Sequence, residues 1–181
     1  MVGGVVKSEL YLSRSPLQSW CEPSGRTLPA VLAPWLLESG SLTQRLRDHG
    51  EGFALELLGY HDVMLAEDEA RWLGEPQARC REVVLSLAGT ACVYGWTLVP
   101  QRGMRCAALA GQGQTPLGEL VFTSGAAQRR ELQVATFAVE QSRWCRAAIV
   151  WGRRSLLEWQ GIPLLVHELF LPGLVDDKES M

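Results

Sequence analysis

Residues 151–172 constrain the fold most, because they combine a hairpin signal with a charge in an apolar strand. Two runs rich in β-branched, aliphatic and aromatic residues flank Gln160 and Gly161, a pair typical of a two-residue turn between antiparallel strands. Pro163 stands at the start of the second run, where the missing backbone N–H of proline is tolerated. The pattern predicts a β-hairpin.

One acidic residue of this hairpin is out of place. Side chains alternate across a strand, so Glu168 shares a face with Val166 and Phe170, whereas His167 lies on the opposite face. Removing an unpaired carboxylate from water costs roughly several kcal/mol or more. Glu168 must therefore be hydrogen-bonded, paired or protonated, and it is the first candidate site residue. The alternatives are a structural arginine that pairs with it and a register shifted by one residue.

A second hairpin is predicted over residues 79–100, with Gly89 and Thr90 as its turn. On its first strand, Arg81 shares a face with Val83 and further aliphatic side chains. Arg81 is thus a second charge aligned with an apolar face. The alternative is an arginine at a strand end whose head group reaches water.

Two short helices are predicted before the first strand. Residues 28–37 have helical composition broken by Pro34. The second helix starts after Ser41, which has capping-box spacing to Gln44, and stops at Gly50.

The middle of the chain contains a further strand and two further helices. A strand is predicted over residues 53–64 with a bulge at Gly59, and a short exposed helix over residues 66–73. Thr115 as N-cap, followed by proline at the first helical position, predicts another helix. The N–H of Leu117 then has no acceptor within the helix, and such an end attracts carboxylates and phosphates.

Composition fits one compact domain. With 181 residues, of which 47% are hydrophobic and 20% charged, the chain can bury one substantial core. We expect a single α+β domain over residues 1–181, with residues 1–27 as an N-terminal arm and residues 176–181 as a polar tail. The formal net charge of -3 gives no electrostatic footprint for nucleic acid or an anionic membrane. The apolar runs are far shorter than the roughly 20 residues of a membrane span.

Neither the cysteines nor the histidines indicate a metal site or a disulfide framework. The five cysteines are odd in number and contain no C-x-x-C pair. His167 and Glu168 begin an H-E-x-x-H motif, but Leu171 stands where the second histidine is needed. The sequence contains no Gly-rich phosphate loop and no serine-nucleophile elbow. It therefore predicts reduced thiols, a cytoplasmic location and no bound metal.

Three motifs carry a resemblance to a known family: TPLGELVFTS at residues 115–124, WGRRS at residues 151–155 and GIPLLVHELFLP at residues 161–172. Together they resemble the chorismate pyruvate-lyases, over residues 34–181. The resemblance implies an antiparallel sheet with helices packed on it and helical flaps, here residues 28–50, over an internal ligand cavity. It also implies removal of pyruvate from chorismate to give 4-hydroxybenzoate, the first committed step of ubiquinone ring synthesis, without a metal or organic cofactor.

Four positions match the site residues of that family. Its key arginine matches Arg81 in R-C-R-E, and its key glutamate matches Glu168 in H-E-L-F-L-P. The leucine of T-P-L-G, whose backbone contacts ligand, matches Leu117, while a ligand-contacting methionine aligns with Leu42, so the residue type differs there. A threonine of the family is replaced by His167. The resemblance implies Arg81 and Glu168 as catalytic residues, and Leu42 and Leu117 as further substrate contacts.

The chemistry expected of these residues follows from the substrate, which is a small dianion. Arg81 suits a carboxylate or the departing ether oxygen, since its planar fork donates two parallel hydrogen bonds. Glu168 in an apolar pocket is expected to hold its proton tightly and to donate it to the ether or phenolic oxygen. Arg153 and Arg154 are neighbours on a strand, so at most one of them points inward.

A non-catalytic module that binds small aromatic ligands is the alternative function, because the same fold type occurs as the effector-sensing domain of transcription regulators. Those regulators carry an N-terminal winged helix, for which residues 1–29 are too short. We expect chorismate and 4-hydroxybenzoate as the partners of a monomer, with no nucleic acid bound and no insertion into a membrane.

Overall fold

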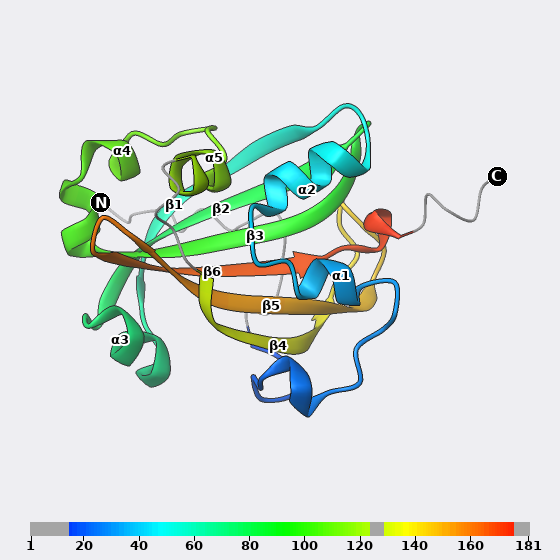
Figure 1. The fold of residues 1–181 in the computed structure, drawn as a ribbon, viewed down its shortest axis with the longest axis horizontal. Coiled ribbons are helices and arrows are strands. Elements are labelled where there is room, and N and C mark those ends of the chain that lie inside the picture. Colours follow the sequence, from blue (N-terminus) through cyan, green and yellow to red (C-terminus); the bar gives the residue numbers. More distant parts are fainter. Residues whose placement is uncertain (1–14, 124–128, 176–181) are drawn as a thin grey trace, which may run out of the picture.

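The computed structural model describes residues 15–123 and 129–175 (Figure 1). Within these residues, six strands form one antiparallel sheet in the order β1-β2-β3-β6-β5-β4. The strands are β1 (Ala54–Met64), β2 (Gln77–Leu87), β3 (Thr90–Pro100), β4 (Arg129–Val139), β5 (Ala148–Trp159) and β6 (Ile162–Phe170). The predicted bulge in β1 is confirmed, because its register with β2 shifts between Leu57 and Gly59. The predicted α+β fold with a single antiparallel sheet is confirmed as well.

The helices of the described residues are short. They are α1 (Ala33–Leu36), α2 (Leu42–His49), α3 (Glu67–Leu73), α4 (Ala107–Ala110) and α5 (Leu117–Phe122), with 3-10 turns at Pro23–Gly25, Gln101–Arg105 and Pro172–Leu174. As predicted, Ser41 caps α2, since its Oγ accepts a hydrogen bond from the Gln44 N–H at 3.2 Å. Pro34 does not break a helix but lies in the first turn of α1, where proline is tolerated. The N-cap of α5 is Pro116 rather than Thr115, so this helix starts one residue later than predicted.

Two hairpins build most of the sheet. The β5–β6 turn lies at Gln160 and Gly161 as predicted, with φ angles of 50° and 75°. The β2–β3 turn lies at Ala88 and Gly89, with φ angles of 46° and 81°, one residue before the predicted position. Such tight turns need positive φ at both central residues, which a β-branched residue disfavours, so Thr90 begins β3 instead.

The sheet separates two layers of side chains. Helices α1, α2 and α5 cover one face, on which Leu46 of α2 is fully buried (Figure 1). On the opposite face, Leu73 of α3 and Trp96 of β3 belong to one apolar cluster. Glu168 faces the first layer, whereas His167 stacks on Trp96 in the second. The predicted alternation along β6 is therefore confirmed.

The segment before α1 runs along the edge strand β4. The Leu17 N–H donates to the Thr136 carbonyl oxygen at 2.8 Å, and Cys21 forms an isolated β-bridge with Val134. The ring of Trp20 packs against the cluster on the face that α3 covers. The edge of the sheet at β4 is thus partly paired by the chain itself, which limits its exposure to other strands.

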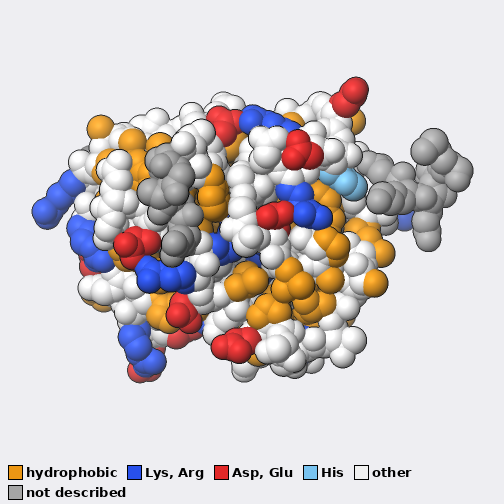
Figure 2. All heavy atoms as spheres, viewed as in Figure 1, with side chains coloured by type: hydrophobic (Ala, Val, Ile, Leu, Met, Phe, Trp, Pro, Cys, Tyr) orange, Lys and Arg blue, Asp and Glu red, His pale blue; other side chains and the backbone are white. Residues whose placement is uncertain are grey.

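Part of the predicted arm, residues 1–14, lies outside the described residues, and so does the whole predicted tail, residues 176–181. In the part of the chain that the structure describes, no helix has the length and apolar character needed to cross a bilayer. Figure 2 shows acidic and basic side chains interspersed over one face, where the described residues form no extended basic area.

His167 contributes to stability in a pH-dependent way. Its side chain is buried, its ring stacks on Trp96 with centroids 4.4 Å apart, and its Nε2 lies 3.5 Å from Glu69 Oε1. Burial lowers the pKa of His167, and the nearby Arg154 charge adds to this, while Glu69 partly offsets it. The folded protein therefore binds a proton at this ring less readily than the unfolded chain does.

We predict that the unfolding free energy decreases as the pH falls below about 6.5, the ordinary pKa of histidine. The contribution of neutral His167 is fully present above that pH and is lost as the pH falls toward the folded pKa, because only the unfolded chain takes up the proton. When the unfolding free energy is measured with urea between about pH 5 and pH 7.5, the slope of this free energy against pH should be smaller in His167→Gln than in the wild type. The exposed control His49→Gln should keep it. Equal slopes for the wild type and His167→Gln would contradict the prediction.

Candidate active site

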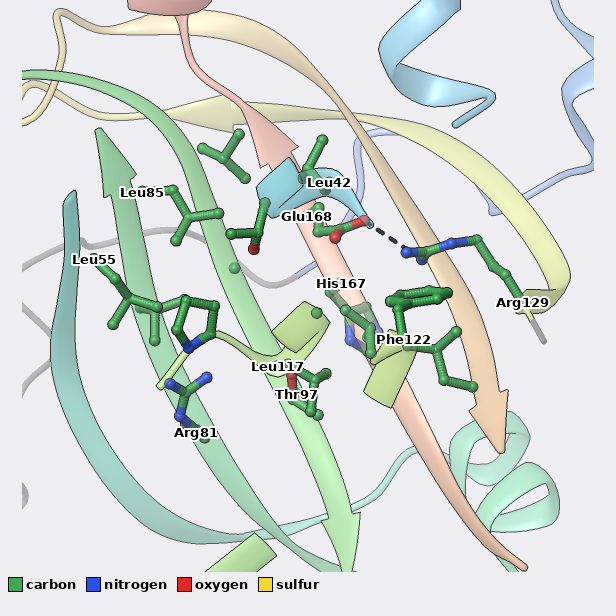
Figure 3. Close-up of a pocket in the computed structure, with 18 residues that line it drawn as sticks. Leu42, Leu55, Arg81, Leu85, Thr97, Leu117, Phe122, Arg129, His167 and Glu168 are labelled. Carbon is green, nitrogen blue, oxygen red and sulfur yellow. Dashed lines mark ion pairs between the residues drawn. The ribbon is translucent and has the colours of Figure 1, made fainter. Parts of the chain in front are cut away.

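A cavity lies between the sheet and the two helices α2 and α5 (Figure 3). All four residues predicted to contact ligand line it: Leu42 from α2, Arg81 from β2, Leu117 from α5 and Glu168 from β6. The other lining residues are Thr43, Leu55, Val83, Leu85, Val93, Gly95, Thr97, Pro116, Gly118, Phe122, Arg129, Leu157, Val166 and His167. The fold thus brings the predicted site residues to one enclosure.

The lid over this cavity consists of the first turn of α2 together with α5. The two helices approach closely at Gly118, where an added Cβ would collide with Ser41 Oγ and lie 3.4 Å from Thr43 Oγ1. The predicted flap over residues 28–50 therefore accounts for one half of the lid, and α5 supplies the other half. About 60 Å³ is open to the centres of water-sized molecules, which is room for a few waters.

Glu168 is paired with two buried arginines. Its Oε2 lies 2.5 Å from Arg153 Nε and 3.7 Å from Arg129 Nη1. Burial alone raises the pKa of a carboxyl, but the charges of Arg153 and Arg129 and the Arg153 hydrogen bond hold the pKa of Glu168 below its usual value. Glu168 is therefore ionised at neutral pH. The expectation that it holds its proton tightly is wrong, and the alternative of a structural arginine partner is observed.

Arg153 also binds the chain that leads into the lid. Its side chain is fully buried, and Nη1 donates to the carbonyl oxygens of Trp35 and Glu38 at 3.0 Å and 2.7 Å. Arg154 points to the opposite face, where its Nη2 lies 2.6 Å from Asp68 Oδ2. One of the two neighbouring arginines therefore points inward, within the predicted limit.

Arg81 stands apart from Glu168 in the cavity wall (Figure 3). The residue is only 4% exposed, so the alternative in which its head group reaches water is wrong. Its Nη2 donates to the carbonyl oxygens of Gly113 and Thr115 at 2.9 Å and 3.0 Å. Burial lowers the pKa of Arg81, and Tyr60 partly offsets this, but a guanidinium stays protonated at neutral pH. Arg81 is a buried cation held by neutral acceptors.

Arg129, the first residue of β4, is a site residue that the sequence reasoning missed. Its side chain is 4% exposed and lines the cavity. Nη1 donates to the Ser155 hydroxyl, and Nη2 donates to the Gly40 carbonyl oxygen at 3.3 Å. Burial lowers the pKa of Arg129 to about 10, with Glu168 opposing the shift and Arg153 adding to it. Arg129 is the second buried cation that faces the cavity.

The alternation that identified Glu168 does not work at the start of β4. The register of β4 with β5 shifts between Arg130 and Gln133, so the facing of side chains cannot be counted along this strand. Arg129 and Arg130 together are also typical of a polar strand end. The sequence contains no further signal that separates the buried arginine from the exposed one.

The described part of the chain contains no cluster of potential metal ligands. There, no group of three or more His, Cys, Asp or Glu side chains is placed to hold a metal ion. All five cysteines are free thiols. The charged side chains at the cavity are the arginines 81 and 129 and Glu168, with Arg153 directly behind the carboxylate.

Known proteins identify the family of this chain. A family model described as chorismate lyase matches residues 17–180. Two curated relatives named "Probable chorismate pyruvate-lyase", from Aeromonas salmonicida (strain A449) and Aeromonas hydrophila subsp. hydrophila, are 44% and 42% identical over 176 residues, or 96% of this chain and 99% of each relative. The solved effector domain of PhnF from Mycobacterium smegmatis has a TM-score of 0.56 at 18% identity, covers 74% of this chain and is itself 89% covered, which shows the fold alone. Because the family model spans nearly the whole chain, this protein belongs to the chorismate lyase family.

Proposed function

We propose that this protein eliminates pyruvate from chorismate and forms 4-hydroxybenzoate, the activity that the names of its curated relatives indicate for those proteins. The observation that carries the proposal is the cavity, in which Arg81, Arg129 and the ionised Glu168 face a largely apolar space. A ring with two carboxylates fits such a space, because apolar walls contact the ring while a few placed polar groups fix its orientation.

The reaction divides the substrate at one C–O bond. In chorismate, the ring carbon that carries the enolpyruvyl ether lies next to the carbon that carries a hydroxyl group. The bond from the ring to the ether oxygen breaks, its electron pair leaves with enolpyruvate, and the hydroxyl-bearing carbon loses its proton. Enolpyruvate takes up a proton at carbon and becomes pyruvate. Aromatisation supplies most of the driving force, so the protein has to orient the substrate and stabilise the departing oxygen.

Each site residue then has a role that its surroundings support. Arg81 and the backbone N–H of Leu117 suit the ring carboxylate, because Leu117 is the first residue of α5 and its N–H has no acceptor within that helix. Leu42 provides an apolar contact from the lid. Glu168 is ionised, so it suits the acceptance of a hydrogen bond from the ring hydroxyl and of the ring proton. This role replaces the proton donor expected from the sequence.

The non-catalytic ligand-binding module is not favoured. Its support is a likeness of fold to the PhnF effector domain at 18% identity. The relatives named as lyases are 44% and 42% identical and align over nearly their whole length.

We further propose that the protein acts as a cytoplasmic monomer whose product enters ubiquinone ring synthesis. The four predicted site residues Leu42, Arg81, Leu117 and Glu168 line one cavity within the same chain. The free cysteines fit a reducing compartment.

The direct test is to incubate the purified protein with chorismate. It should release 4-hydroxybenzoate and pyruvate in equal amounts, and exhaustive chelation should leave the rate unchanged. Binding of 4-hydroxybenzoate without any conversion of chorismate would favour the ligand-binding module. Loss of activity on chelation, restored by a divalent ion, would contradict cofactor-free catalysis.

Arg81→Lys tests the first cation. Lysine keeps the charge but loses the planar fork, so kcat/KM for chorismate should fall by roughly tenfold or more while a thermal melt shows a folded protein. The control is Arg79→Lys on the same strand, where the arginine pairs with the exposed Asp62 at 3.1 Å and does not line the cavity. Its kinetics should match those of the wild type. Wild-type kinetics in Arg81→Lys would remove Arg81 from the site.

Glu168→Gln tests the buried ion pair. The amide leaves Arg153 and Arg129 without their anion, so the unfolding free energy should fall by roughly 3 to 5 kcal/mol. Turnover of chorismate should fall by on the order of a hundredfold. The control Glu158→Gln removes an exposed ion pair with Arg130 and should change stability by less than about 1 kcal/mol. Urea unfolding and the chorismate assay on each preparation separate the two effects: unchanged stability would contradict the pairing, and unchanged turnover would remove Glu168 from the reaction.

A further inference from the structure

The charges around the Glu168 end of the cavity do not balance. Arg153 and Arg129 both approach the single carboxylate of Glu168. Glu38, whose backbone carbonyl oxygen accepts a hydrogen bond from Arg153, is matched by Arg45, whose Nη1 lies 2.8 Å from Glu38 Oε2. The described residues of this cluster therefore carry one positive charge more than they carry negative charges. A buried cation in excess is costly, which points to an anionic group that the described residues do not supply.

Arg129 is the cation in excess. Arg153 is the closer partner of Glu168, at 2.5 Å against 3.7 Å for Arg129. Arg153 also has the backbone carbonyls behind it as acceptors, whereas Arg129 lines the cavity. Within the described residues, the buried Nε of Arg129 has no hydrogen-bond partner, and neither has Nη2 of Arg153, but only Arg129 of the two lines the cavity. Its donors are thus not fully used, and it stands where a ligand can reach it.

The second cation of the cavity lies on its other side. Figure 3 shows Arg81 on β2 and Arg129 on β4 with the lining of the cavity between them. Arg81 is held by neutral carbonyl oxygens, and no carboxylate of the described residues contributes to its pKa. Arg81, which has no carboxylate partner among the described residues, and Arg129, which shares Glu168 with Arg153, match a ligand with two separated carboxylates.

We propose that Arg129 binds the enolpyruvyl carboxylate of the substrate, while Arg81 binds the ring carboxylate. This assignment rests on the proposed function. In chorismate, the ring carboxylate and the ring hydroxyl are at opposite ends of the ring, and the ether carbon is next to the hydroxyl-bearing carbon. With the ring carboxylate at Arg81 and the hydroxyl at Glu168, the leaving group meets Arg129, the one of the two arginines beside Glu168 that lines the cavity.

The assignment makes Arg129 the residue that distinguishes substrate from product. The product 4-hydroxybenzoate keeps the ring carboxylate and the hydroxyl group but has lost the carboxylate of the leaving group. Arg129 therefore contributes to the binding of chorismate and not to that of 4-hydroxybenzoate, whereas Arg81 contributes to both. A residue that merely maintained the shape of the cavity would affect both ligands alike.

The experiment compares two ligands in three variants. In Arg129→Gln, kcat/KM for chorismate should fall by roughly ten- to a hundredfold, the usual effect of losing hydrogen bonds to a charged group. The Kd of 4-hydroxybenzoate, measured by calorimetry, should change by less than about threefold. Arg81→Gln should weaken both. The matched control is Arg130→Gln, the exposed neighbour that pairs with Glu158 at 2.5 Å, which should leave both values unchanged.

The outcomes separate this inference from the proposed function. Unchanged kcat/KM in Arg129→Gln, or an equal loss of affinity for product, would overturn the role of Arg129. If Arg129→Gln does not fold in a thermal melt, Arg129→Lys replaces it, and a loss confined to chorismate supports the role. A wild type that never converts chorismate defeats the proposed function alone. In that case chorismate is tested as a competitor of 4-hydroxybenzoate, and a selective loss of its binding in the Arg129 variant upholds the inference.

Discussion

The ion pair between Glu168 and Arg153 is the interaction on which the rest of the site depends. Both residues are buried, and Arg153 without Glu168 would leave an uncompensated charge inside the protein. They meet because they are direct partners in the register of β5 and β6, which the tight turn of that hairpin sets. Arg153 in turn binds carbonyl oxygens of the last turn of α1 and of Glu38 just after it, so the same pair positions the chain where it enters the lid. The β5–β6 hairpin, which the sequence predicts, is thus linked through Arg153 to the lid of the cavity.

Much of the site is predictable from strand periodicity, and its limits have a physical cause. Glu168 and Arg81 stand out because each interrupts an apolar face of a regular strand. The partner of Glu168 cannot be read in the same way, since the choice between Arg153 and Arg154 depends on the register between two strands. That missing partner also explains the wrong direction of the expected pKa, because burial without the arginine charges raises it. The position of Arg129 in the cavity wall cannot be predicted from the sequence, because Arg129 precedes a register shift in β4.

The fold shows the same division between local and tertiary information. The strand β1 with its bulge at Gly59, the β5–β6 hairpin and the cap of α2 follow from residues close in sequence, and they lie where the sequence places them. The observed turn between β2 and β3 lies one residue before the predicted turn. Several neighbouring residues are compatible with a turn, and the requirement for positive φ at both central positions decides among them. The second half of the lid is a tertiary feature. The N-terminus of α5 is visible in the sequence as an anion-binding end, but its contact with α2 at Gly118 is not.

The central claim is that Glu168 is an anion that Arg153 and Arg129 hold inside the protein. The most direct measurement is the titration of its side-chain carboxyl by NMR in protein with ¹³C-labelled glutamate, with the resonance assigned by its absence in Glu168→Gln. We expect a pKa below the usual value of about 4.3, because the two arginine charges outweigh the effect of burial. A pKa near or above neutrality would show a protonated acid at this position. It would contradict the ion pair, and with it the charge excess that assigns the second carboxylate to Arg129.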